Sequence, residues 1–149
     1  TSGKRGWYID LPVGQGELIA TNAQVRGNTV SFSTTIPNTE QCTASGSGYF
    51  MLVDRRTGGR TQTPAFDLNG DKQLNVADDS FARKENGEDI AVGASGLLIK
   101  QGIPNEASYQ AVPGSDVGTY YLPDSSGKVR IGYVPLGSDR HRSWREIRR

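Results

Sequence analysis

ELIATNAQVRGNTVSFSTTIP, residues 17–37, holds two short runs of alternating apolar and polar residues on either side of Gly27 and Asn28. A Gly-Asn pair between two such runs is typical of the two-residue turn of a β-hairpin. We expect Val25, Val30 and Phe32 to be the buried side chains around that turn. The stretch therefore predicts antiparallel strand pairing.

Short strand patterns recur along the rest of the chain. GYFMLVD, residues 48–54, is almost continuously apolar, which predicts a central strand covered on both faces. We expect a strand in GWYIDLP that Pro12 closes, and a turn at Gly58-Gly59. Further strands are expected in residues 89–104. A second hairpin is expected in residues 119–135, with its turn at residues 124–127. Seven or eight short strands with turns every 8–12 residues or so are typical of a sandwich, a barrel or a propeller segment.

Composition supports this fold class and excludes several functions. The 149 residues suffice for one core, so we expect a single β domain or fragment spanning residues 1–149. Gly accounts for 19 residues and only 34% are apolar, which favours a turn-rich β protein. The 17 basic residues are balanced by 16 acidic ones, so the net charge gives no positive field that would attract nucleic acid. No apolar run approaches the roughly 18 residues of a membrane span, and we expect a mature, soluble fragment.

DLNGDKQLNVADD, residues 67–79, repeats Asp and Asn at every second or third position. Calcium takes oxygen ligands from positions 1, 3, 5, 7, 9 and 12 of a twelve-residue loop. The spacing predicts a calcium loop over residues 67–78; its ligands are Asp67, Asn69, Asp71, Gln73 through its backbone carbonyl, Asn75 directly or through a water, and Asp78. The alternative is a solvated turn, because Asp, Asn and Gly also dominate turns without metal.

Two positions differ from the standard EF-hand. Lys72 replaces the invariant Gly at position 6, and Asp78 replaces the bidentate Glu at position 12. With Gly70 at position 4, the loop is closer to those of extracellular modules such as dockerins, for which affinities of about 10⁻⁴ to 10⁻³ M are typical. We expect Leu74 to point into the core, and residues 76–85 to form a short helix of one or two turns.

The remaining candidates indicate binding rather than catalysis. Cys42 is the only cysteine and His141 the only histidine, no residue pattern supplies a nucleophile with its base, and the Glu85–Glu88 pair is expected to be solvated. We therefore expect no enzyme activity. Five Arg in the last ten residues are expected to be solvated, while Trp144 packs on the body. Five strand aromatics form either a binding face or core packing, and they are Trp7, Tyr8, Tyr120, Tyr121 and Tyr133.

Several motifs together resemble the C-terminal region of the PilY/PilC family of type IV pilus assembly and adhesion proteins. They are Gly-Trp-Tyr at residues 6–8, the strand ending at Pro37, the N-T-x-x-C segment ending at Cys42, Thr-Gly-Gly at residues 57–59, the F-D-x-N-G-D loop from Phe66, and Ser-Trp-Arg-Glu from Ser143. The resemblance covers most of residues 6–85 and the tail, and it is looser over residues 88–140.

The resemblance implies the last part of a β-propeller-like domain that carries calcium in the same loop, ending at the natural C-terminus. It implies export to the bacterial cell surface, the outer membrane or the pilus tip. It also implies a role in pilus extension, retraction (twitching motility) and adhesion. The implied partners are minor or major pilins, a host-surface receptor and the upstream region of the same protein. An alternative is a dockerin-like or carbohydrate-binding accessory module of a secreted enzyme.

Overall fold

The protein is mainly β with antiparallel sheets, as predicted. The computed structural model describes residues 6–11, 16–38, 46–85, 88–111, 114–115 and 117–135. These residues contain ten strands and one turn of 3₁₀ helix, in the order β1 (Leu18–Ile19), β2 (Gln24–Arg26), β3 (Thr29–Thr35), β4 (Gly48–Asp54), η1 (Val76–Asp78), β5 (Asp79–Glu85), β6 (Glu88–Gly93), β7 (Gly96–Ile99), β8 (Ser108–Ala111), β9 (Val117–Pro123) and β10 (Val129–Pro135). No helix within these ranges is long and apolar enough to cross a membrane.

The first sheet is built around β4, which lies between β3 and β7. On the edge of β3 that faces away from β4, β2 pairs with residues 29–31 and β1 pairs with residues 34–35. Phe50 and Leu52 of β4 are 1% exposed on one face, and Val53 is equally buried on the other. The prediction of a central strand covered on both faces is confirmed, and the apolar run at residues 48–54 is its cause.

The first hairpin turns where it was predicted. Gly27 has φ 52°, a conformation that favours glycine, and Arg26 pairs with Thr29 across the turn. The prediction of burial is confirmed for Phe32 but wrong for Val25, which is 62% exposed, while Val30 is half-buried. β2 is a three-residue edge strand, so its outer face has no covering layer.

The face of β3 that turns towards the second sheet is polar, yet it is buried. Ser31 is 5% exposed and Ser33 is 2% exposed. Ser33 Oγ donates a hydrogen bond to the Asn105 carbonyl (2.8 Å), and Ser31 Oγ accepts one from the Tyr109 hydroxyl (2.5 Å). These bonds offset the cost of burying hydroxyl groups and join β3 to the segment that leads into β8.

The second sheet has the order β10–β9–β8. Its β9–β10 hairpin turns through residues 124–127, as predicted, and Gly127 has φ 82°. Asp124 Oδ1 accepts hydrogen bonds from the Ser126 hydroxyl (2.5 Å), the Ser126 N–H (2.9 Å) and the Lys128 N–H (3.3 Å). These bonds, with the Ser126 hydroxyl first, lower the pKa of Asp124, so the carboxylate remains charged and fixes the turn.

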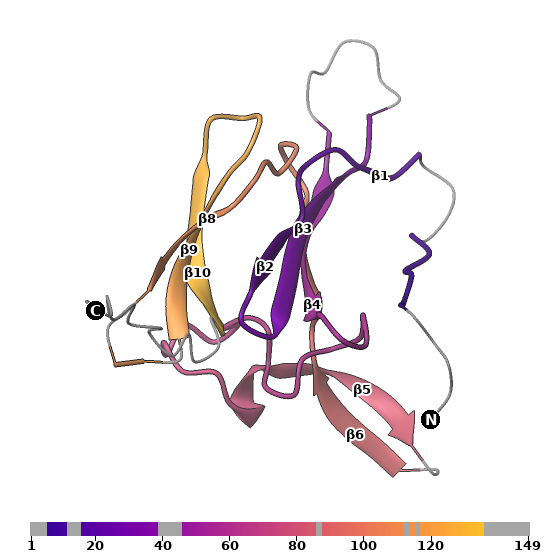
Figure 1. Ribbon diagram of the computed structural model, residues 1–149, viewed down its shortest axis with the longest axis vertical. Helices are drawn as coiled ribbons and strands as arrows, with labels where there is room; N and C mark the ends of the chain where they lie inside the picture. The colour runs from indigo at the N-terminus through magenta and orange to yellow at the C-terminus, as the bar shows by residue number, and fades with distance from the viewer. Residues whose placement is uncertain are drawn as a thin grey trace, which may run out of the picture.

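The two sheets pack face to face around an aromatic centre (Figure 1). The rings of Phe50 and Tyr120 lie 5.1 Å apart at their centroids, and Phe66 packs against both at 5.8 and 6.4 Å. Phe66 comes from the segment that precedes the acidic loop. The loop therefore starts directly at the core. The buried core cluster comprises Phe50, Leu52, Ala65, Phe66, Ile99, Ala107, Tyr120, Leu122 and Val134.

β5 and β6 form a separate hairpin that pairs with neither sheet and projects from the body (Figure 1). The predicted helix over residues 76–85 is therefore mostly wrong. Only Val76–Asp78 is helical, and Asp79–Glu85 is a strand. An isolated helix of this length is marginal, whereas pairing with β6 satisfies the backbone of residues 79–85.

The strand predicted for residues 6–12 is also wrong. Residues 6–11 pair with no strand, and residue 12 lies outside the described ranges. A side chain holds the segment instead. Trp7 Nε1 donates to the Arg55 carbonyl (2.8 Å), and the indole covers Gly58 so closely that a Cβ there would lie 2.4 Å from the ring. The turn at Gly58-Gly59, by contrast, is confirmed by the hydrogen bonds that join both residues to Asp54.

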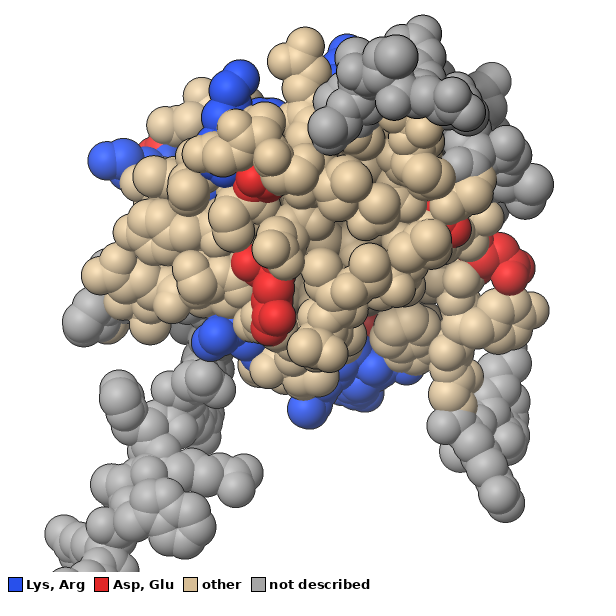
Figure 2. Space-filling model, turned by 90° about the horizontal axis from the view of Figure 1, so that it is seen from above, with Lys and Arg blue, Asp and Glu red and all other residues tan. Residues whose placement is uncertain are grey.

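Charged side chains are dispersed over the surface. Figure 2 shows one face on which Lys and Arg alternate with Asp and Glu across a mostly uncharged surface. This face carries no field of one sign, in keeping with the nearly balanced charge of the whole chain.

Candidate metal centre

The acidic loop is fixed at both ends. At its start, the Asp67 N–H donates to the Tyr133 carbonyl of β10 (3.3 Å), directly after the buried Phe66. At its end, the Asn75 side chain accepts from the Ala77 N–H (2.8 Å) and caps η1. Asn is a preferred N-cap because its side-chain oxygen satisfies a backbone donor of the first turn. The loop is thus held between the second sheet and a capped turn.

The first three predicted ligands turn their oxygens back over the loop. Asp67 accepts hydrogen bonds from the N–H groups of Gly70 (2.6 Å) and Lys72 (2.9 Å). Asn69 Oδ1 accepts from the Asp71 N–H (2.8 Å), and Asn69 Nδ2 donates to Asp71 Oδ2 (3.2 Å). The contact from Asn69 to the N–H two residues later is an Asx-turn, and Asp67 reaches the N–H groups three and five residues later. These bonds tie the backbone of the loop to its own side chains.

Asp78 closes the loop from beneath. It is 1% exposed, and its carboxylate accepts from the N–H groups of Leu68 (2.9 Å), Asn69 (3.4 Å) and Asn75 (3.1 Å). A buried carboxylate needs such donors, since an unpaired one would be costly. Position 12 of the loop is thereby joined to positions 2, 3 and 9.

Position 6 has the backbone conformation of the EF-hand turn although it is not glycine. Lys72 has φ 65°, and it is the only non-glycine residue with positive φ in the described part of the chain. Gly70 at position 4 has φ 81°. Lys72 therefore adopts a φ that favours glycine, and an L-residue in this conformation costs about 1–2 kcal/mol.

The six predicted ligands differ in exposure along the loop, five of them as side chains and Gln73 as a backbone carbonyl. Asn69, Asp71 and Gln73 are exposed, Asp67 and Asn75 are half-buried, and Asp78 is buried. Among the described residues, no three Asp, Glu, His or Cys side chains converge closely enough to hold a metal. Three of the predicted ligands are neutral oxygens. The donor set is therefore all oxygen, which suits a hard cation such as calcium rather than zinc.

Comparison with known proteins connects this chain to one group of relatives. The chain is 30% identical over 115 residues, 69% of its length, to type IV pilus biogenesis factor PilY1 in two strains of Pseudomonas aeruginosa. It is 42% identical over 72 residues, 45% of its length, to a PilY1 homolog from Xylella fastidiosa.

The chain is a PilY1-like region. The match spans only 10% of the Pseudomonas relatives and 6% of the Xylella relative. No family model matches the region, and neither does any solved structure.

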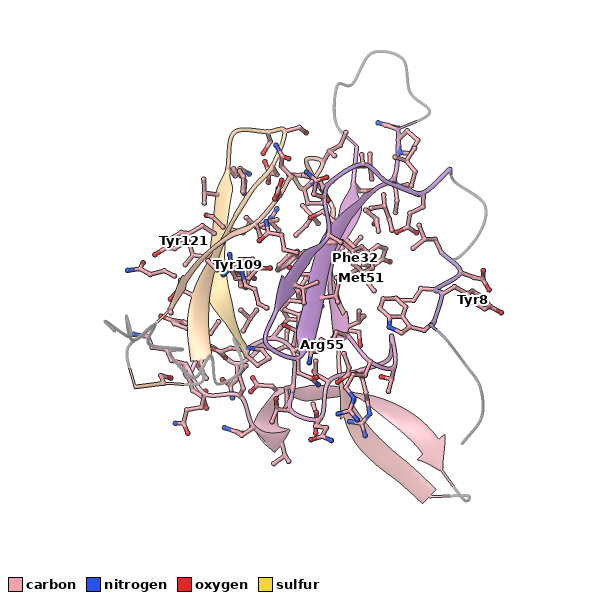
Figure 3. The ribbon with its side chains drawn as sticks, viewed as in Figure 1. Tyr8, Phe32, Met51, Arg55, Tyr109 and Tyr121 are labelled. Atoms are coloured by element: carbon pink, nitrogen blue, oxygen red, sulfur yellow. The ribbon has the colours of Figure 1, made fainter. Side chains whose placement is uncertain are left out.

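The five aromatic candidates for a binding face in the PilY1-like region do not form one face. Tyr120 is 6% exposed in the core, whereas Tyr8 is 84% exposed beyond the first sheet. Tyr121 points outward from β9, away from the first sheet (Figure 3), and its hydroxyl donates to Gln110 (2.9 Å). Core packing is therefore the correct alternative for Tyr120, and the common binding face is excluded for the set.

Other sequence candidates cannot be placed in the site. Cys42, His141 and Trp144, with the arginine-rich tail, lie outside the described residues, as do the side chains of Glu85 and Glu88. Leu74, the expected anchor at position 8, is half-buried. Sequence reasoning missed the carbonyl of Tyr133, which fixes the start of the loop. No local signal could have revealed it, because every residue has a carbonyl and the contact is set by how the two sheets pack.

Proposed function

We propose that this region is part of a surface-exposed type IV pilus assembly and adhesion protein. The observation that carries the proposal is the identity to PilY1 across most of the chain, since PilY1 relatives are named type IV pilus biogenesis factors. The partners we propose are minor or major pilins, a host-surface receptor and the upstream region of the same protein. The place of action is the outer membrane or the pilus tip, and the role is binding rather than catalysis.

We further propose that the loop at residues 67–78 binds calcium. Its donors would be the carboxylates of Asp67, Asp71 and Asp78, the amide oxygens of Asn69 and Asn75, and the Gln73 carbonyl. The support is the all-oxygen donor set and the turn at Lys72, which already has the conformation of position 6. Calcium would neutralise three carboxylates that otherwise repel one another, so its binding energy would add to the stability of the loop.

The surroundings of the loop suggest how occupancy would be transmitted. The loop is fixed to β10 through Asp67 and Tyr133, and it continues without a break from Asp78 into β5. Ordering the loop would therefore fix the β5–β6 hairpin relative to the second sheet. We propose that this ordered form tunes pilus extension and retraction or adhesion, within the C-terminal part of a β-propeller-like domain.

The test compares two aspartate variants in the bacterium that makes the protein. Asp71→Ala removes an exposed loop carboxylate, whereas Asp10→Ala removes an exposed carboxylate outside the loop. We expect Asp71→Ala to change the number of surface pili and the extent of twitching motility. The matched variant Asp10→Ala should behave as the unmodified protein. Surface pili are counted by electron microscopy with equal amounts of protein verified.

Two outcomes would contradict the proposal. If piliation and adhesion are unchanged after deletion of the whole gene, the proposed pilus function is contradicted. If Asp71→Ala and Asp10→Ala have equal effects, the proposed role of the loop is contradicted, while the proposed pilus function still stands.

A further inference from the structure

A polar groove lies at the seam between the two sheets, far in sequence from the acidic loop. It has a volume of about 400 Å³ and is open to solvent. This volume falls within the range typical of small-molecule sites. The groove is lined by Gln24, Arg26, Glu106, Ala107, Ser108 and Tyr109. Its walls are β2 and the segment that enters β8, two elements that each pair with one neighbour only.

One wall is held in place by Gln24. Its Nε2 donates to Glu106 Oε1 (2.7 Å) and to the Ala107 carbonyl (2.9 Å), so both amide hydrogens are used. These bonds join β2 to the segment before β8. They also position the Glu106 carboxylate at the groove, with its second oxygen available as an acceptor.

The other polar group is a guanidinium held by stacking. Arg26 lies over the Tyr109 ring, 4.4 Å from its centroid, and the Tyr109 hydroxyl donates to Ser31 (2.5 Å). Figure 3 shows Tyr109 in the space between β2 and the second sheet. A cation–π contact of this kind holds the guanidinium over the ring without using its N–H groups. Within the described ranges, those N–H groups make no hydrogen bond or ion pair.

The two charges line one groove yet do not pair. The ion pair found among the described residues joins Arg130 to Asp124, not Arg26 to Glu106. The hydroxyl of Ser108, which also lines the groove, makes no hydrogen bond within the same part of the chain. The groove thus offers a fixed donor, a fixed acceptor and a hydroxyl, with no net charge.

We propose that this groove binds a neutral carbohydrate through adjacent hydroxyl groups of one sugar ring. Sugar hydroxyl groups can donate to the Glu106 carboxylate and accept from the Arg26 guanidinium, and the ring that carries them has no charge. An anionic ligand would be repelled by Glu106 and a cationic one by Arg26. Because the groove is open and the charged groups of Arg26 and Glu106 remain hydrated, we expect weak affinity for the carbohydrate, in the millimolar range.

The test uses ligand-observed NMR on the whole protein in chelator. The probes are methyl α-mannopyranoside, methyl β-galactopyranoside and methyl N-acetyl-β-glucosaminide, with N-acetylneuraminic acid as the anionic comparison and choline as the cationic one. We expect saturable binding of at least one neutral glycoside. Loss of a charge-assisted hydrogen bond in Arg26→Ala should weaken it roughly tenfold. Ser108→Ala, which removes one exposed hydroxyl, should weaken it less.

Arg60→Ala serves as the matched control, since Arg60 is exposed and lies outside the groove. It should leave glycoside binding unchanged, and thermal melting checks that all variants are folded. Three results would overturn the proposal: no saturable glycoside binding, equal binding by the Arg26→Ala and unmodified proteins, or binding by the charged probes alone. The use of chelator makes this test independent of calcium, so its failure would leave the proposed pilus function standing.

Discussion

At the scale of single residues, Lys72 is the most informative position. The ligand spacing of the loop is a local property, so the sequence alone predicts a calcium loop. It did not predict that Lys72 would have φ 65°, since L-residues rarely adopt this conformation. The hydrogen bond from the Lys72 N–H to Asp67 Oδ2 (2.9 Å) helps to hold it there. Lys72 therefore adds backbone strain to the loop.

This strain predicts a difference between two variants. Lys72→Gly and Lys72→Ala both remove the same charge, but only glycine adopts positive φ without penalty. We expect the free energy of unfolding of Lys72→Gly to exceed that of Lys72→Ala by about 1 kcal/mol in calcium-free buffer. Urea unfolding measures it. Equal stability of the two variants would mean that residue 72 does not have positive φ in solution.

Burial of single residues was predicted only in part. The alternation around Gly27 places Val25 opposite Val30, as the pairing of β2 with β3 bears out. Alternation says which side chains share a face, but not whether another element covers that face. Phe32 is covered and Val25 is not, because β2 lies at the edge of its sheet.

At the scale of elements, local turn chemistry was readable and long-range pairing was not. The turns at residues 27–28, 58–59 and 124–127 were all predicted, because glycine and Asx residues fix them locally. Residues 79–85 were expected to be helical, yet they pair with β6. Residues 6–11 were expected to form a strand, yet Trp7 alone holds them to the turn at Gly58. The partner of Trp7 lies about fifty residues away, whereas β6 follows β5 directly, and the Asn86-Gly87 pair between them is a local hairpin signal that the helical interpretation overlooked.

The contact between Trp7 and the turn gives a sharp prediction. Gly58 has φ 69°, and a Cβ there would meet the indole at 2.4 Å, so Gly58→Ala introduces both strain and a clash. We expect it to lower the free energy of unfolding by about 2 kcal/mol, measured in urea.

Gly59→Ala is the neighbouring control. A Cβ at this position would lie 3.6 Å from the nearest atom, and Gly59 does not have positive φ. We therefore expect only a small change in the free energy of unfolding. Equal losses in the two variants would contradict the packing of Trp7 on this turn.

At the scale of the whole molecule, two packed sheets hold the acidic loop and the groove in different places. The predicted β class followed from strand spacing, but the order β10–β9–β8 and its packing through Tyr120 required the structure. That packing brings the Tyr133 carbonyl to Asp67 and the segment before β8 to Gln24. The loop was therefore visible in the sequence, whereas its anchor and the groove were not.

The most direct test of the calcium-binding account is a calorimetric titration of calcium into the chelator-stripped protein, with thermal melting alongside. We predict binding at a single site and a rise in melting temperature, both lost in Asp71→Ala and both retained in Asp10→Ala. Absence of heat and of stabilisation at millimolar calcium would contradict the account, and residues 67–78 would then be a turn held by its own Asx hydrogen bonds.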